Sequence, residues 1–231
     1  MPTALSHDHH SIVSLLEGVR DFNVRVFPEK QEMFSDLAGG QSPHTLFIAC
    51  ADSRVSPGMI TQQPPGAMFV LRNIGNIVPT YGEMLGGVSA AIEYAVIALG
   101  VKHIIVCGHS DCGAMKALLE PEAHRLDSMP TVASWLRNAE TARAVTAAIH
   151  PHAHGAEAVA VLAEQNVLLQ LDHLRTHPAV AARVAEGRLL LQGWLYDIAS
   201  GSIHVFDGLT RRPYTLDEAI AALRIEAGAT A

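Results

Sequence analysis

Two short segments of the chain place metal-binding and ionisable side chains directly after apolar runs. Residues 48–55 read IACADSRV and residues 107–115 read CGHSDCGAM. Cys50, His109 and Cys112 form a set of two thiols and one imidazole. These ligands suit zinc, and three of them leave a fourth tetrahedral position for water. The spacing alone leaves a second interpretation equally open: a buried cysteine, a core histidine and a thiol at a helix start.

The elements around these segments explain why the two would meet. Apolar runs at 45–50, 67–73 and 103–109 are predicted strands, and 86–100 is a predicted helix. Strands that alternate with helices predict an α/β fold, with a mostly parallel central sheet flanked by helices. Ligands of such sheets bind beyond the carboxyl ends of the strands. Cys50 ends the first strand, and His109 and Cys112 follow the third, so we expect the two segments to converge.

The remaining elements complete the predicted fold. Helices are expected at 11–38, 131–148, 156–175 and 216–225, with a further short helix opening at Pro178. The first part of the 11–38 segment, about 11–27, is expected to be an N-terminal amphipathic arm. Residues 188–207 read as strand, turn and strand, which predicts a C-terminal antiparallel edge. The length predicts a single domain over 1–231, with residues 1–10 as a mobile N-terminus.

The composition argues against several classes of protein. The chain has 231 residues, a net charge of −7 and no basic block, which argues against a nucleic-acid partner. The longest apolar stretch, 88–101, contains Glu93 and is too short to span a membrane. The first residues lack the apolar core of a signal peptide, so a cytoplasmic protein is expected. Three cysteines make a poor disulfide framework, and Cys107 is predicted to be a buried thiol.

The motifs around the ligand set resemble those of the β-class carbonic anhydrases. The Cys-x-Asp-x-Arg element of that family matches Cys50, Asp52 and Arg54, and its Gly-His-x-x-Cys-Gly element matches residues 108–113. Other similar segments are GQSP (40–43), RNIGNIVP (72–79), GGVSAAIEYAV (86–96) and GWLYDIASG (193–201), so the resemblance covers about residues 11–213. It implies one Zn2+ per chain on Cys50, His109 and Cys112. It also implies hydration of CO2 to bicarbonate and a proton through a zinc-bound hydroxide, in a homodimer or a larger assembly such as a tetramer.

Asp52 and Arg54 are the predicted catalytic pair. Asp52 is two residues from the ligand Cys50, close enough to accept a hydrogen bond from a zinc-bound water. Arg54 lies two residues further, on the same side of an extended segment, and its planar fork can hold the carboxylate off the metal. The alternative is a local salt bridge of little consequence. Asp111 stands between two ligands and is expected to be solvent-exposed rather than coordinating.

The resemblance also implies a set of substrate-binding residues. Phe69, Ile74 and Tyr94 would line an apolar wall for CO2, and Gly113 would allow close approach. Gln41 matches a family glutamine that hydrogen-bonds substrate across the dimer interface. Without the resemblance, Phe69 and Ile74 read as core packing and Gln41 as a turn residue.

Three other functions compete with this interpretation. The same zinc site could serve a CS2 or COS hydrolase. A non-catalytic bicarbonate-binding zinc protein is the second alternative, although the presence of Asp52 and Arg54 does not favour it. A thiol redox protein is the third, and the lack of a Cys-x-x-Cys motif counts against it.

The resemblance further predicts how the site is regulated. Some β-class enzymes move the aspartate onto zinc while bicarbonate occupies a second site built from a tryptophan, an arginine and a tyrosine. The corresponding positions here look like Phe47, Arg72 and Tyr94, and Phe47 lacks the indole N–H donor. An open-site enzyme is therefore expected, with Asp52 paired to Arg54 near neutral pH.

Overall fold

The computed structural model describes residues 8–83 and 86–229, and the chain divides into two compact units, with the boundary between Gln41 and Ser42. The first unit contains α1 (Asp8–Asp21), a π-helical turn (Phe22–Val26), α2 (Phe27–Glu29) and α3 (Gln31–Ala38). The single helix expected over 11–38 is therefore interrupted. Pro28 has no N–H to donate to the preceding turn, and Lys30 leaves the helical region at φ −115° and ψ 16°. Of the predicted mobile segment 1–10, residues 1–7 lie outside the described part and 8–10 begin α1.

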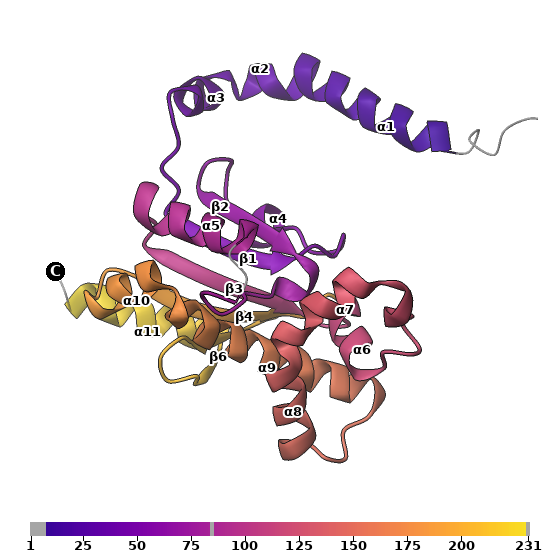
Figure 1. The fold of residues 1–231 in the computed structure, drawn as a ribbon. Helices are drawn as coiled ribbons and strands as arrows, with labels where there is room; N and C mark the ends of the chain where they lie inside the picture. The colour runs from indigo at the N-terminus through magenta and orange to yellow at the C-terminus, as the bar shows by residue number, and fades with distance from the viewer. Residues whose placement is uncertain (1–7, 84–85, 230–231) are drawn as a thin grey trace, which may run out of the picture. The chain divides into compact units, whose positions relative to one another are not determined.

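The second unit is built on a six-stranded sheet with the order β2-β1-β3-β4-β5-β6 (Figure 1). The strands are β1 (Thr45–Cys50), β2 (Met68–Asn73), β3 (His103–His109), β4 (Leu190–Tyr196), β5 (Ile203–Asp207) and β6 (Pro213–Thr215). β2, β1, β3 and β4 are parallel, and β5 and β6 are antiparallel. The predicted α/β class and antiparallel C-terminal edge are confirmed. β6 was not predicted, because it is three residues long and begins with proline.

Helices connect and cover the strands of this unit. They are α4 (Pro57–Thr61), α5 (Gly87–Glu93) with a π-helical turn (Tyr94–Ala98), α6 (Gly113–Leu119), α7 (Pro130–Leu136), α8 (Glu140–Ile149), α9 (Gly155–Thr176), α10 (Pro178–Ala185) and α11 (Leu216–Ala229). Short 3-10 turns cover Ile74–Asn76, Leu126–Ser128 and Arg137–Ala139. The helix expected over 131–148 is divided between α7 and α8 by the last of these turns. α4 and α6 were not predicted, because each is shorter than two full turns.

The core of this unit is split by the sheet. Side chains on β1 alternate, so Leu46 and Ile48 join the large cluster under α9 and α10, whereas Phe47 and Ala49 join a smaller cluster on the other face. Helix α9 packs on β3 and β4. Its Val167 stands over glycines on both strands: a Cβ added to Gly108 or Gly193 would come within 2.6 Å of a Val167 methyl group. The glycines thus let the long helix approach the sheet closely.

The order of the strands fixes where a site can form. From β1 the chain goes to β2 on one side and then crosses to β3 on the other, so β1 and β3 are neighbours whose connections diverge. The crevice beyond the carboxyl ends of two such strands is where open α/β sheets bind ligands. The IACADSRV and CGHSDCGAM segments begin within these two strands. Within the described residues, no helix is both long enough and apolar enough to cross a membrane.

Candidate metal centre

Cys50, His109 and Cys112 come together at the ends of β1 and β3. Their ligand atoms all lie within 4.8 Å of one another, and the three residues are buried, with exposures of 5%, 0% and 1% respectively. Cys50 is the last residue of β1, and its side chain lies on the face covered by α6 and α9. His109 ends β3, and Cys112 directly precedes α6. The convergence expected from the sequence is confirmed.

The histidine of this group is arranged as a metal ligand. Its Nδ1 lies 2.8 Å from the backbone carbonyl oxygen of Ser110, a contact in which the ring must donate. The Nδ1–H tautomer leaves a lone pair on Nε2, which is the usual arrangement of a metal-bound histidine. Nε2 is buried, and it has no hydrogen-bond partner among the described residues. A buried acceptor without a partner, next to two thiols, is what is expected of a metal ligand, so the residues fit zinc.

The two thiols of the group favour a shared negative charge. A hydrogen bond from Cys112 lowers the pKa of Cys50 to about 4, and the backbone amides of Asp52 and Gly75 contribute to this shift. The same hydrogen bond, together with burial, raises the pKa of Cys112. Zinc binds the thiolate form of cysteine, and the lowered pKa of Cys50 favours that form. Cys107 lies outside the group, and burial raises its pKa to about 12, which agrees with the predicted buried thiol.

Asp52 and Arg54 form a bidentate ion pair next to the metal ligands. Arg54 Nε donates to Asp52 Oδ1 at 2.9 Å and Nη2 donates to Oδ2 at 2.8 Å, while the Arg54 backbone N–H also reaches Oδ1. These contacts lower the pKa of Asp52, so the carboxylate is ionised at neutral pH. Asp52 Oδ2 lies 3.9 Å from His109 Nε2, although Asp52 is not part of the ligand group.

Two further residues, Arg72 and Asp111, make hydrogen bonds to the segment that follows β1, and these contacts were not predicted. Arg72 on β2 donates to the backbone carbonyls of Cys50 and Asp52. Asp111 is exposed, as expected, but it also accepts a hydrogen bond from Arg54 and pairs with Lys116. The backbone of Asp111 has a positive φ of 58°. The only sign of this in the sequence is that aspartate tolerates such a conformation better than most residues.

The predicted substrate residues are not all close to the ligands of their own chain. Ile74 follows Asn73, the register partner of Cys50, and an added Cβ at Gly113 would meet nothing within 4 Å. Phe69 is paired with Leu46, four residues before Cys50, which places it about 13 Å back along the strand. Tyr94 packs on Phe69, with ring centroids 5.9 Å apart. Gln41 is exposed at the end of the first unit.

The structure corrects the proposed second bicarbonate site. Phe47 is fully buried against Trp194, on the face of the sheet opposite the cluster that Phe69 borders, and Tyr94 packs on Phe69. Within one chain, Phe47 and Tyr94 therefore cannot share a ligand. Tyr196 is the tyrosine that packs in the Phe47 cluster. The assignment of Tyr94 was wrong because sequence spacing does not reveal on which face a helix packs.

Comparison with known proteins decides the family. The family model described as carbonic anhydrase matches residues 45–203. A carbonic anhydrase from Pseudomonas aeruginosa is 51% identical over 204 residues, covering 88% of this chain and 91% of that protein. The chain belongs to the β-class carbonic anhydrases. The solved β-carbonic anhydrase CcaA is 41% identical, with a TM-score of 0.86 over 89% of this chain and 92% of that one.

Other members of the family agree with this assignment. A tetrameric β-carbonic anhydrase from Sordaria macrospora is 30% identical, with a TM-score of 0.75 over 89% of this chain and 100% of that one. The resemblance first seen in the two ligand segments is confirmed, as is membership of a carbonic anhydrase enzyme family. β-Carbonic anhydrases are zinc enzymes, and Cys50, His109 and Cys112 are placed to bind one metal ion.

Proposed function

We propose that the chain catalyses the reversible hydration of CO2 to bicarbonate and a proton with one zinc ion. The observation that carries this proposal is the buried, unpartnered Nε2 of His109 among two thiols, next to the ionised pair of Asp52 and Arg54. A zinc ion on these ligands would lower the pKa of a water molecule, which makes a nucleophile available at neutral pH. Family membership supports the same reaction.

Asp52 is the proposed hydrogen-bond acceptor for the reacting water. Its Oδ1 accepts two hydrogen bonds from Arg54, whereas Oδ2 accepts one and keeps a lone pair. Oδ2 is also the atom nearer the ligand group, at 3.9 Å from His109 Nε2. Arg54 keeps the carboxylate ionised and turned so that Oδ2 faces the site. The carboxylate can therefore orient the water and accept its hydrogen bond.

The proposed substrate wall needs a second copy of the chain. Ile74 and Gly113 lie at the ligand end, but Phe69 and Tyr94 lie too far along the sheet to reach their own site. They sit on or beside the edge strand β2, where Val70 and Tyr94 are 44% and 50% exposed. A homodimer could bring them, together with Gln41, to the partner's site. The exposed apolar residues of α1, such as Leu15 and Leu16, are a further surface that association could cover.

The proposal is tested by stopped-flow measurement of CO2 hydration with a pH indicator. The zinc-loaded protein should accelerate hydration, a chelator should abolish the activity, and zinc should restore it. CS2 and COS are assayed in parallel, since hydrolysis of either without CO2 hydration would favour the alternative hydrolase. Bicarbonate binding without turnover would instead show a non-catalytic protein. Sedimentation tests the dimer, and cell fractionation tests the predicted cytoplasmic location.

A further inference from the structure

Arg54 is bound by two acidic residues, and only one of them belongs to the pair described above. Its Nη1 donates to Asp111 Oδ2 at 3.0 Å, and its Nη2 donates to the backbone carbonyl of Asp111 at 3.2 Å. Asp52 takes the Nε–H and the other Nη2–H. Four of the five N–H groups of the guanidinium are thus engaged. The two acids use different N–H groups, so they hold Arg54 together and do not compete for it.

The backbone of Asp111 explains how one residue offers both acceptors. Its φ of 58° is in the left-handed region, which aspartate tolerates better than most residues. Asp111 therefore turns the chain between His109 and Cys112 while its carbonyl and carboxylate both reach Arg54. Because Arg54 also holds Asp52, it connects the turn after Cys50 to the turn that carries the other two ligands.

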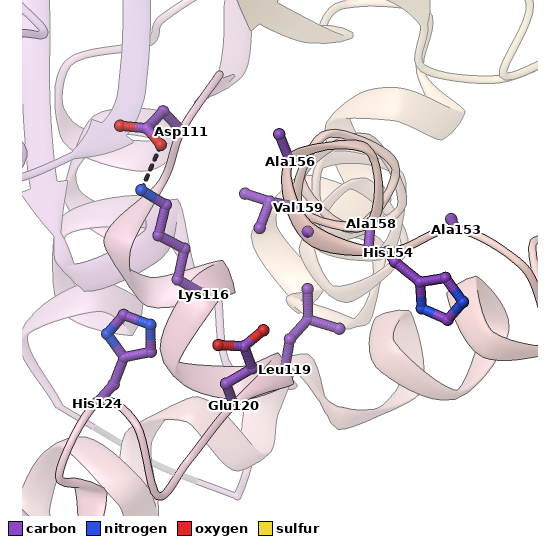
Figure 2. A pocket seen from close by; sticks show the side chains of 11 residues that line it. Asp111, Lys116, Leu119, Glu120, His124, Ala153, His154, Ala156, Ala158 and Val159 are labelled. Atoms are coloured by element: carbon purple, nitrogen blue, oxygen red, sulfur yellow. Dashed lines mark ion pairs between the residues drawn. The ribbon is translucent and has the colours of Figure 1, made fainter.

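Lys116 holds Asp111 from the other side. Its Nζ pairs with Asp111 Oδ1, whereas Arg54 is bound to Oδ2, so each carboxylate oxygen has its own cation. Figure 2 shows this pair at one wall of a cavity of about 450 Å³ between α6 and the start of α9. The side chains of Arg54, Asp111 and Lys116 are 44%, 53% and 36% exposed. Ion pairs as exposed as these add little to folding stability. We therefore expect Asp111 to affect the position of the Arg54 guanidinium rather than the stability of the fold.

We propose that Asp111 is a positioning residue, which fixes the Arg54 guanidinium from the side opposite Asp52 and so keeps Asp52 aimed at the reacting water. Lys116 orients Asp111 in turn. This inference rests on the proposed function, since it assigns a role within the same site. Asp111 itself does not belong to the ligand group of Cys50, His109 and Cys112.

The test is a double-mutant cycle between Asp111 and Arg54. Asp111→Asn keeps the shape and the left-handed backbone but removes the charge, and Asp127→Asn is the matched control on an exposed acid elsewhere in the chain. We expect Asp111→Asn to lower kcat by roughly tenfold, less than the ~10²-fold or greater loss typical of a positioned proton-transfer group. Asp127→Asn should keep the wild-type kcat. In an Arg54→Ala background, Asp111→Asn should have no further effect, because it acts through Arg54.

A second readout does not depend on turnover. Selective ¹⁵N labelling of arginine reports the exchange of the Arg54 Nε–H with solvent, and Asp111→Asn should make that exchange several-fold faster at unchanged zinc content. Lys116→Met should give a smaller change in the same direction, and Lys116→Arg should restore the wild-type value.

Three outcomes would overturn the inference. They are a kcat equal to that of Asp127→Asn, an equal loss of activity in both Arg54 backgrounds, or a loss of activity that simply follows loss of zinc. A wild-type protein that does not hydrate CO2 would instead refute the proposed function. The exchange measurement would still decide whether Asp111 holds Arg54.

Discussion

Val167 on α9 lies directly over Gly193 on β4, so that a Cβ added to the glycine would come within 2.6 Å of Val167 Cγ1. We expect Gly193→Ala to destabilise the fold by about 1–3 kcal/mol, the usual cost of overpacking a close contact. Adding Val167→Ala should recover part of this loss. Urea denaturation measures both variants. Gly18→Ala is the control: among the described residues, no atom outside the neighbouring helix backbone lies within 4 Å of its added Cβ, so it should be neutral or stabilising.

The metal centre gives the second prediction. Cys112→Ala removes one of three ligands and should cause strong loss of zinc, measured by elemental analysis of the purified protein. Cys107→Ala alters a buried thiol outside the ligand group and should keep its zinc. In a zinc-loaded crystal, bonds of roughly 2.3 Å to sulfur and 2.0–2.1 Å to nitrogen are expected. Full zinc content and normal activity in Cys112→Ala would refute the ligand assignment.

Asp52 and Arg54 should act as one unit. Asp52→Asn removes the charge of the acceptor, and Arg54→Ala frees the carboxylate to turn away or to reach the metal. Each change should lower kcat by a factor of order 10² or more. The double variant should be little worse than either, because members of one unit are not additive. Additive losses would show that the two residues have independent roles.

Bicarbonate should not switch this enzyme off cooperatively near neutral pH. Phe47 is fully buried and offers no hydrogen-bond donor, and Arg72 already donates to two backbone carbonyls. The missing charge-assisted hydrogen bond, worth roughly 1.5–3 kcal/mol, would weaken the binding of bicarbonate next to Phe47. Activity measured against added bicarbonate at pH 7.5 should therefore fall smoothly. A crystal grown near that pH with Asp52 on zinc would contradict this expectation.

Two histidines on α9 and just after it should make the fold sensitive to acid. Burial lowers the pKa of both His173 and His177, which contact the carbonyls of Val78 and Pro79. A lowered pKa means that the unfolded chain binds the proton more tightly than the fold does. Stability should thus be fully present above the unfolded value of about 6.5 and fall as the pH drops below it. His177→Gln should flatten the dependence of Tm on pH between 7.5 and 5.5, measured by thermal denaturation at a series of pH values.

The parallel sheet could be predicted from local features, whereas the ligand set was predicted from the resemblance of its two segments to the family motifs, because its spacing alone left a second interpretation open. Cys50 and His109 end unbroken apolar runs, and strands that run parallel must bring such ends to the same edge. The predicted ends of these two strands, at Cys50 and His109, were correct to the residue. The roles of Asp52 and Arg54 depended on a short spacing within one loop, and the ion pair is formed as expected.

The features that sequence reasoning missed depend on contacts between distant residues. Asp111 meets Arg54 across 57 positions, and the sequence indicates its left-handed backbone only through the general tolerance of aspartate for that conformation. Tyr94 was wrongly assigned to the site of Phe47, on the opposite face of the sheet. The face on which Tyr94 lies depends on how its helix packs, and the sequence does not show that packing. The first helical segment is interrupted at Lys30, whose backbone is not helical. Pro28 was the only residue nearby that could have indicated an interruption from the sequence.

The position of the ligands along the chain has a consequence for folding. β1 and β3 are neighbours in the sheet, yet about 60 residues separate Cys50 from His109, so an ion held by both closes a large loop. It acts as a removable cross-link between the two central strands. Since a preformed set of ligands rarely survives in an unfolded chain, the free energy of metal binding is also free energy of folding. We therefore expect the folded chain to be more stable with its metal than without it, because the ion links two strands that are far apart in the sequence.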